Sequence, residues 1–275
     1  ERKIIMTKLE QKALELREWI IRSLASAGSG HPGGSLSAID ILTTLYYQEM
    51  DISVENYDQK DRDHFILSKG HAAPALYTVL ADKGFFPKEE LLDLRKFGCH
   101  LQGHRDRIKT KGVDSSSGSL GQGLSIANGL ALAQRLDGIQ KKVYILIGDG
   151  ELQEGQVWEA AMTAAHYKLS NVIAFVDNNG LQIDGTNDEV MGVKDIGQKF
   201  AAFNWNVLTA DGHDFDLLTA TIKEAKAQEK GPTVIVCQTT KGKGISFMED
   251  QVGWHGKAPS SEEAEKALAE LKEAL

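Results

Sequence analysis

The chain has 275 residues, of which 41% are apolar and 25% charged, and its formal net charge is -8. A chain of this composition can bury a sizeable core, and its excess of acid disfavours a broad surface for nucleic acid or anionic membranes. No apolar stretch approaches the ~18 residues of a membrane span and no signal-peptide core occurs at the start, so we expect a cytoplasmic protein without a membrane partner. Cys99 and Cys237 lack a metal-binding or redox spacing, and we expect two buried thiols.

Helical periodicity dominates the first fifty residues. Apolar positions fall near one face over residues 8–28, and the run Gly28-Ser29-Gly30 predicts the end of this helix. A second helix is expected over residues 35–48.

Short apolar or β-branched runs then alternate with helix-length stretches. The expected strands are residues 65–67, 143–147, 172–176 and 234–236, with 205–209 as a further candidate. Residues 214–228 are expected to form a crossover helix, and 260–275 an amphipathic helix that a Ser-Ser-Glu-Glu signal begins. This alternation predicts an α/β fold, a doubly wound, mostly parallel sheet with helices on both faces, formed as a single domain by residues 1–275.

The motif GDGELQEG, residues 148–155, follows one of these strands and places an acid, Asp149, at its end. Thirty residues later the next strand ends in Asp177-Asn178-Asn179-Gly180. If the two strands are neighbours, Asp149 and Asn179 meet at one edge of the sheet. Taken separately, each motif is more typical of a turn; together at this spacing they favour a Mg²⁺ site, because carboxylate and amide oxygens are hard ligands that magnesium shares with water and phosphate.

At this point the sequence resembles a known family. An acid in G-D-G with an asparagine about thirty residues downstream is similar to the thiamine-diphosphate-binding motif, and the surrounding chain resembles the transketolases. The matching segments, in the family's order, are SGHPGGSLS (29–37), LSKGHAAPALY (67–77), GSLGQGLSIANG (118–129), GDGELQEGQVWEA (148–160), NNGLQIDG (178–185), TKGKGISFMED (240–250) and WHGKAP (254–259).

The resemblance implies a cofactor and a metal, thiamine diphosphate held through Mg²⁺ or Ca²⁺. Its metal ligands would be Asp149, Asn179 and the carbonyl of Leu181. The contacts to the cofactor itself would come from His71, Gly118, Ser119, Leu120, Gly150, Asn179, Ile183 and His255. The glycine-rich start of the helix expected after residue 124 has an equally good explanation in tight helix-to-sheet packing.

Four histidines lie in or beside the matching segments. The resemblance implies catalytic positions for His31, His71, His104 and His255, with His31 and His255 also at the sugar; together they form a polar cluster able to move protons near neutral pH. Arg105 stands where the family has a proline after His104, which weakens that assignment. His213 is expected in a cap or turn, and His64, His100 and His166 are expected to have only structural roles.

Two lysines and one glutamate complete the implied site. Lys241 and Lys257 would flank the channel by which sugar phosphates arrive, although without the resemblance a solvated loop is the simpler explanation of residues 241–244. Glu154 is expected in the first turn of a helix that starts near Gln153, where its charge favours the helix start. The family analogue of Glu154 suggests a role in coupling between subunits.

The resemblance covers only the diphosphate-binding half of a transketolase. It implies an N-terminal subunit, inactive alone, that pairs with a separate C-terminal, pyrimidine-binding subunit carrying the activating glutamate, as an α₂β₂ assembly in the pentose phosphate pathway. A truncated full-length enzyme is a second explanation. The chain could also be half of a 2-oxoacid dehydrogenase or of a 1-deoxyxylulose 5-phosphate synthase-like enzyme, or a non-catalytic paralogue that scaffolds a partner. A nucleotide-binding interpretation of GSLGQG lacks the strand before it.

Overall fold

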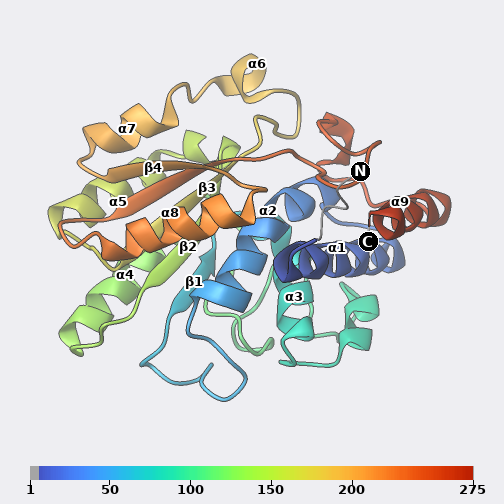
Figure 1. Cartoon of the computed structure of the whole chain (residues 1–275), viewed down its shortest axis with the longest axis horizontal. Coiled ribbons are helices and arrows are strands. Elements are labelled where there is room, and N and C mark those ends of the chain that lie inside the picture. The colour runs from blue at the N-terminus through green and yellow to red at the C-terminus, as the bar shows by residue number, and fades with distance from the viewer. Residues whose placement is uncertain (1–5, 275) are drawn as a thin grey trace.

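A five-stranded parallel sheet forms the centre of the molecule, with helices on both faces (Figure 1). The computed structural model describes residues 6–274. The strands, in spatial order, are β1 (His64–Leu67), β2 (Val143–Gly148), β3 (Val172–Asn178), β5 (Thr233–Gln238) and β4 (Asn206–Asp211). The predicted α/β fold class and all five expected strands are therefore confirmed.

The register of β2 and β3 brings the two polar strand ends together. Val143 pairs with Val172, and the ladder continues until Gly148 lies beside Asp177. Asp149 thus follows β2, and Asn179 follows β3, at the same carboxyl edge. The expectation that these two strands are neighbours is confirmed.

The helices expected over residues 8–28, after residue 124, and over residues 214–228 and 260–275 are confirmed to within about two residues, whereas those over residues 73–82, 187–191 and 196–202 were not predicted. The helices are α1 (Lys8–Ala27), α2 (Pro32–Thr44), α3 (Ala73–Asp82), α4 (Gly123–Leu136), α5 (Gly155–His166), α6 (Asn187–Met191), α7 (Ile196–Ala202), α8 (Phe215–Ala227) and α9 (Ser261–Glu273). α2 starts three residues earlier than expected, because Pro32 occupies its first position, where a missing N–H costs nothing. α9 begins with the expected capping box between Ser260 and Glu263.

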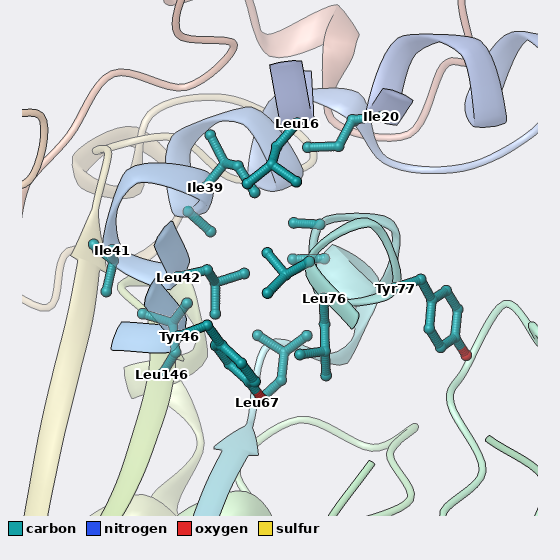
Figure 2. Packing of buried hydrophobic residues seen from close by; sticks show 14 of the residues in the cluster. Leu16, Ile20, Ile39, Ile41, Leu42, Tyr46, Leu67, Leu76, Tyr77 and Leu146 are labelled. Carbon is teal, nitrogen blue, oxygen red and sulfur yellow. The ribbon is translucent and has the colours of Figure 1, made fainter. Parts of the chain in front are cut away.

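One face of the sheet is covered by α1, α2, α3 and α8. Figure 2 shows Leu42 of α2 and Leu76 of α3 packing near Leu67 and Leu146 of the strands, all nearly inaccessible to solvent. Alternate strand residues point to this face, as a two-residue period requires. α2 is buried along its whole length, so its first turn is held rigidly near the carboxyl ends of the strands.

The opposite face is covered by α4, α5 and α7, whose small residues allow close packing. Ala127 of α4 and Ala161 of α5 are fully buried beside Ile145 of β2. Cys237, in β5, is buried, but Cys99 is partly exposed, so the expectation of two buried thiols is wrong for Cys99. Its position in an irregular loop outside the sheet explains the difference. No helix within residues 6–274 is long and apolar enough to cross a membrane.

Candidate functional site

A cavity of about 280 Å³ opens at the carboxyl ends of β1, β2 and β3. It receives the loops that leave these strands and the first turn of α2. Residues singled out from the sequence line most of it: His31, His71, His104, Gly118, Leu120, Asp149, Gly150, Glu154, Asn179, Leu181, Ile183, Lys241 and His255. Segments far apart along the chain thus converge on one cavity, as expected at this edge of a parallel sheet.

The carboxylate of Asp149 is buried and holds the two loops together. It accepts hydrogen bonds from the N–H of Gly150 at 2.8 Å and from the N–H of Gly180 at 2.5 Å. Burial, together with the nearby charge of Asp177, raises the pKa of Asp149 to about 6. An opposing positive charge at this carboxylate would therefore favour its ionised form.

Asn179 and Leu181 lie in the loop that Asp149 anchors. The side-chain oxygen of Asn179 accepts the N–H of Leu181 at 3.2 Å, and the carbonyl of Leu181 accepts the ammonium of Lys241 at 2.9 Å. Within residues 6–274, no three His, Cys, Asp or Glu side chains are grouped to hold a metal ion. The oxygens gathered here are instead of mixed type: carboxylate, amide and main-chain carbonyl.

A buried ion pair that the sequence interpretation missed forms the floor of the cavity. The ammonium of Lys69 donates to Asp177 and to the carbonyl of Gly34, the latter at 3.0 Å. Asp177 also accepts the hydroxyls of Ser37, at 2.6 Å, and of Thr239. Although Asp177 is completely buried, Lys69 and these donors hold its pKa below the ordinary value.

Glu151 is a second buried acid without an assigned role from the sequence. It accepts the N–H groups of Gly121 at 2.8 Å and Gly148 at 3.0 Å, and the hydroxyl of Ser68. Burial raises its pKa above the ordinary value. Glu151 therefore joins the loop before α4 to the ends of β1 and β2 and fixes the shape of the cavity wall.

Three of the four expected histidines form a compact cluster. The ring centroids of His31, His71 and His255 are 5.1–5.6 Å apart. Burial and the cations nearby lower the pKa of His31 to about 4 and that of His255 to about 3, and they hold the pKa of His71 well below its usual value. All three rings are therefore neutral near pH 7. His104 lines the same cavity but is exposed.

Lys241 lies inside the cavity wall and not on a solvated loop. It is only 2% exposed and donates to Nδ1 of His255 at 2.7 Å as well as to the carbonyl of Leu181. Burial and the charge of Lys69 lower the pKa of Lys241 to about 8. A bound anion would relieve the repulsion between these two lysines.

Ser119 and Lys257 are not among the residues that line the cavity. Ser119 is exposed in the loop before α4. The ammonium of Lys257 pairs with Glu263 at 2.6 Å and lies 4.4 Å from the ring centre of Trp254. Glu154 lines the cavity, but it precedes the first residue of α5 instead of lying in its first turn, because residues 150–153 form a short 3-10 turn.

His213 has a more specific environment than the expected cap or turn. Its main-chain N–H donates to Asp211 at 2.8 Å, as in a turn, but its ring lies between Asp40 and Thr240. Arg105, which stands at the family's proline position, is buried and donates to the carbonyl of Leu67 at the end of β1. It thereby ties the loop of His104 to the sheet.

The arrangement combines oxygen ligands, two buried lysines and neutral imidazoles around one cavity. The lysines suit a polyanion, the oxygens suit a hard cation, and the neutral imidazoles can each donate and accept a hydrogen bond. The sequence-based expectation that this cluster moves protons near neutral pH is not supported, because the pKa values of all three rings lie well below 7. Chemically, the site is suited to a metal-bound diphosphate beside a reacting polar molecule.

Comparisons with known proteins agree with this chemistry. Residues 10–273 match the family described as "Transketolase, thiamine diphosphate binding domain". The chain is 42% identical over 264 residues to the 6-deoxy-6-sulfo-D-fructose transketolase subunit SqwG of Clostridium sp. (strain MSTE9), covering 96% of each chain. It is 38% identical over 267 residues to an apulose-4-phosphate transketolase subunit of Phocaeicola vulgatus, covering 97% of this chain and 95% of that one.

A solved structure of transketolase from Pichia stipitis in complex with sedoheptulose-7-phosphate superimposes with a TM-score of 0.90 at 29% identity. The match covers 97% of this chain but only 41% of the Pichia chain. This chain therefore belongs to the transketolase family and corresponds to the N-terminal, thiamine-diphosphate-binding subunit of a split transketolase.

Proposed function

We propose that this chain acts with a separate C-terminal subunit to transfer a two-carbon ketol unit from a ketose phosphate to an aldose phosphate, with Mg²⁺ and thiamine diphosphate. The observation that carries the proposal is the convergence of Asp149, Asn179 and the Leu181 carbonyl with three neutral histidines on one cavity. The relatives that match over nearly their whole length are named as subunits for 6-deoxy-6-sulfo-D-fructose and apulose-4-phosphate, so anionic sugars are the substrate class that we infer.

The residues present fit the proposed cofactor and metal. Nδ1 of His31 is buried and has no hydrogen-bond partner within residues 6–274, so it is available to a bound molecule. A Cβ at Gly34 would lie 3.2 Å from Nε2 of His71 and 3.3 Å from the ammonium of Lys69, so the missing side chain leaves room for these two groups at the cavity. Lys69 and Lys241 supply two positive charges for a diphosphate.

Asp149, Asn179 and the Leu181 carbonyl would hold Mg²⁺ (Ca²⁺ could substitute), and Gly150 would place its main chain against the diphosphate. The Leu181 carbonyl has a second lone pair besides the one that accepts Lys241. Gly118, Ser119, Leu120 and Ile183 would contact the rings of the cofactor. We further infer that residues 1–275 form one diphosphate-binding domain.

Thiamine diphosphate, when bound, would supply the nucleophilic chemistry of ketol transfer. The residues of this chain would position the sugar through hydrogen bonds. His31 and His255 would donate hydrogen bonds to the carbonyl and hydroxyl groups, and His71 would contact the diphosphate. His104 would take part in catalysis, and Lys241 and Lys257 would flank the channel by which sugar phosphates arrive. Lys241, already bonded to His255, would also fix the orientation of that ring.

We propose that the group activating the pyrimidine end of the cofactor comes from the C-terminal subunit, and that the two chains form an α₂β₂ assembly in the cytoplasm, serving the pentose phosphate pathway. Glu154, exposed beside the cavity, would face the partner. The chain alone would then bind the cofactor weakly at most and transfer no ketol unit.

The test combines the purified chain with the C-terminal subunit isolated with it from the same source. Xylulose 5-phosphate and ribose 5-phosphate should be converted only by the mixture, and only with thiamine diphosphate and Mg²⁺. Asp149→Ala should abolish this activity and Mg²⁺-dependent cofactor binding, whereas Asp188→Ala, at an exposed position, should not. Comparable turnover by the isolated chain would refute the subunit proposal, turnover of pyruvate would favour a different thiamine enzyme, and no cofactor binding by the mixture would favour a non-catalytic scaffold.

A further inference from the structure

We propose that Asp40, Arg17 and His213, which lie outside the cavity, form a clamp that positions Lys241 within it. The proposal rests on the function proposed above, because it assigns the clamp to the same site. The clamp holds residues 240–243 by hydrogen bonds at both ends, and the side chain of Lys241 extends from this segment to the cavity wall.

The carboxylate of Asp40, on the buried helix α2, is the centre of the clamp. It is 3% exposed and accepts hydrogen bonds from both terminal nitrogens of Arg17, at 2.8 and 2.6 Å. It also bonds Nδ1 of His213 at 2.7 Å. Arg17 and the bonded histidine keep the pKa of Asp40 below its ordinary value in spite of its burial.

Each partner of Asp40 holds one end of the segment. Nε2 of His213 accepts the main-chain N–H of Thr240 at 2.8 Å, and Nε of Arg17 donates to the carbonyl of Lys243 at 3.0 Å. One carboxylate therefore controls both ends of the segment that carries Lys241.

The partners of His213 define its protonation. A main-chain N–H can only donate, so Nε2 must be an unprotonated acceptor, and the ring hydrogen must lie on Nδ1, pointing to Asp40. Asp40 thus selects the one neutral tautomer that can bond Thr240, in the way that a carboxylate orients the imidazole of a catalytic pair. The charged residues that line a pocket together with His213 are Glu10, Arg17, Asp40 and Lys243, and Asp211 accepts its main-chain N–H.

The position of Lys241 depends on this segment because the hydrogen bonds of its side chain are all made by the terminal ammonium. Its ammonium bonds the Leu181 carbonyl and His255, so movement of the main chain at residue 240 would shift both contacts. Other main-chain bonds, from Gly242 to Gly33 and from Asp250 to Lys241, limit the movement. We therefore expect a displaced Lys241 and a weaker grip on an anion, not an unfolded loop. His213 is a positioning residue and does not touch the substrate.

A pair of substitutions separates the two bonds of the ring. In His213→Gln the side-chain oxygen can take the place of Nε2 and accept Thr240; in His213→Asn the amide nitrogen can take the place of Nδ1 and donate only to Asp40. Arg17→Lys keeps the charge beside Asp40 but loses the donor to Lys243. His100→Asn, at a partly exposed histidine that bonds Glu90, is the matched control.

Two measurements are made on each variant: hydrogen exchange of the amides of residues 240–243 in the free chain, and the dissociation constant for Mg²⁺-thiamine diphosphate with the C-terminal subunit present. His213→Asn should speed exchange at Thr240 and weaken cofactor binding, each about tenfold, as expected for loss of one hydrogen bond. His213→Gln and the control should remain within about twofold of the native chain, and Arg17→Lys should speed exchange at the Lys243 end.

Equal effects of His213→Asn and His213→Gln would overturn the proposal, because they would show that the histidine only fills space. Unchanged exchange at Thr240 in His213→Asn would overturn it as well. Exchange in the free chain requires no cofactor, so it would still report on the clamp if the proposed function failed.

Discussion

The buried pair of Lys69 and Asp177 yields the sharpest prediction. Lys69 is 1% exposed and Asp177 is inaccessible, so removing either partner leaves an uncompensated charge in the core. Breaking such a pair costs about 3–5 kcal/mol. At about 2–4 °C per kcal/mol for a chain near this size, Lys69→Met and Asp177→Asn should each lower the melting temperature by roughly 6–20 °C.

The two substitutions should differ in their effect on the affinity of the cavity for an anion. Lys69→Met removes one of two buried cations at the cavity and should weaken binding of Mg²⁺-pyrophosphate by about tenfold or more, the value of one charged hydrogen bond. Asp177→Asn leaves both cations and removes a competing negative charge, so the affinity should rise or stay unchanged. The double variant should recover most of the stability, because no charge is left unpaired.

Thermal unfolding and calorimetry with inorganic pyrophosphate measure the two effects. Lys194→Met is the control: its partner Asp188 is 3.4 Å away and both side chains are more than 70% exposed, so the change in stability should stay within about 0.5 kcal/mol. Three results would contradict these roles of Lys69 and Asp177: core variants that lose no more stability than the control, a double variant that loses the sum of the single effects, or weaker pyrophosphate binding by both single variants.

Two further predictions concern pH and backbone conformation. Folding lowers the pKa of His31 from an ordinary 6.5 to about 4, so the unfolded chain binds a proton at a higher pH than the folded chain, and the free energy of unfolding should fall as pH falls from 6.5 towards 4. In His31→Gln this loss should be smaller by about 1 kcal/mol at pH 5, after allowance for partial exposure, and identical profiles of unfolding free energy against pH in the two chains would contradict the assignment. Gly121 has φ +81°, and a Cβ there would lie 2.8 Å from the Cβ of Glu154, so Gly121→Ala should lower the free energy of unfolding by about 2–3 kcal/mol in a melting experiment. The control Gly138→Ala, at φ +73° with no neighbour within 4 Å, should lower it by about 1 kcal/mol, and equal losses in the two variants would exclude the steric effect.

The sheet and the meeting of Asp149 with Asn179 were predictable because their signals are local. Apolar runs define the strands, and parallel neighbours place their carboxyl ends at one edge. The thirty residues between Asp149 and Asn179 accommodate one helix and one strand, so their proximity follows from the spacing.

Other parts of the site depend on contacts that no local pattern reveals. Asp177 directly follows a predicted strand, but only the folded chain shows that Lys69 compensates its charge. His213 and Asp40 are likewise brought together across most of the chain, so the sequence favoured a turn where the structure has a buried hydrogen-bond chain. Such pairings can be suspected from a charged residue at a strand end, but the partner cannot be named.

The convergence of distant segments on one cavity has a consequence for how the protein acquires its site during synthesis. His31 leaves the ribosome long before Lys241 and His255, and β1 must wait for β2, whose Val143 pairs with His64. Closing so long a loop before its contacts form makes the sheet slow to assemble. The nascent chain therefore exposes the apolar side chains of β1 until β2 has been made, and the binding site is complete only after Lys241 and His255 have emerged.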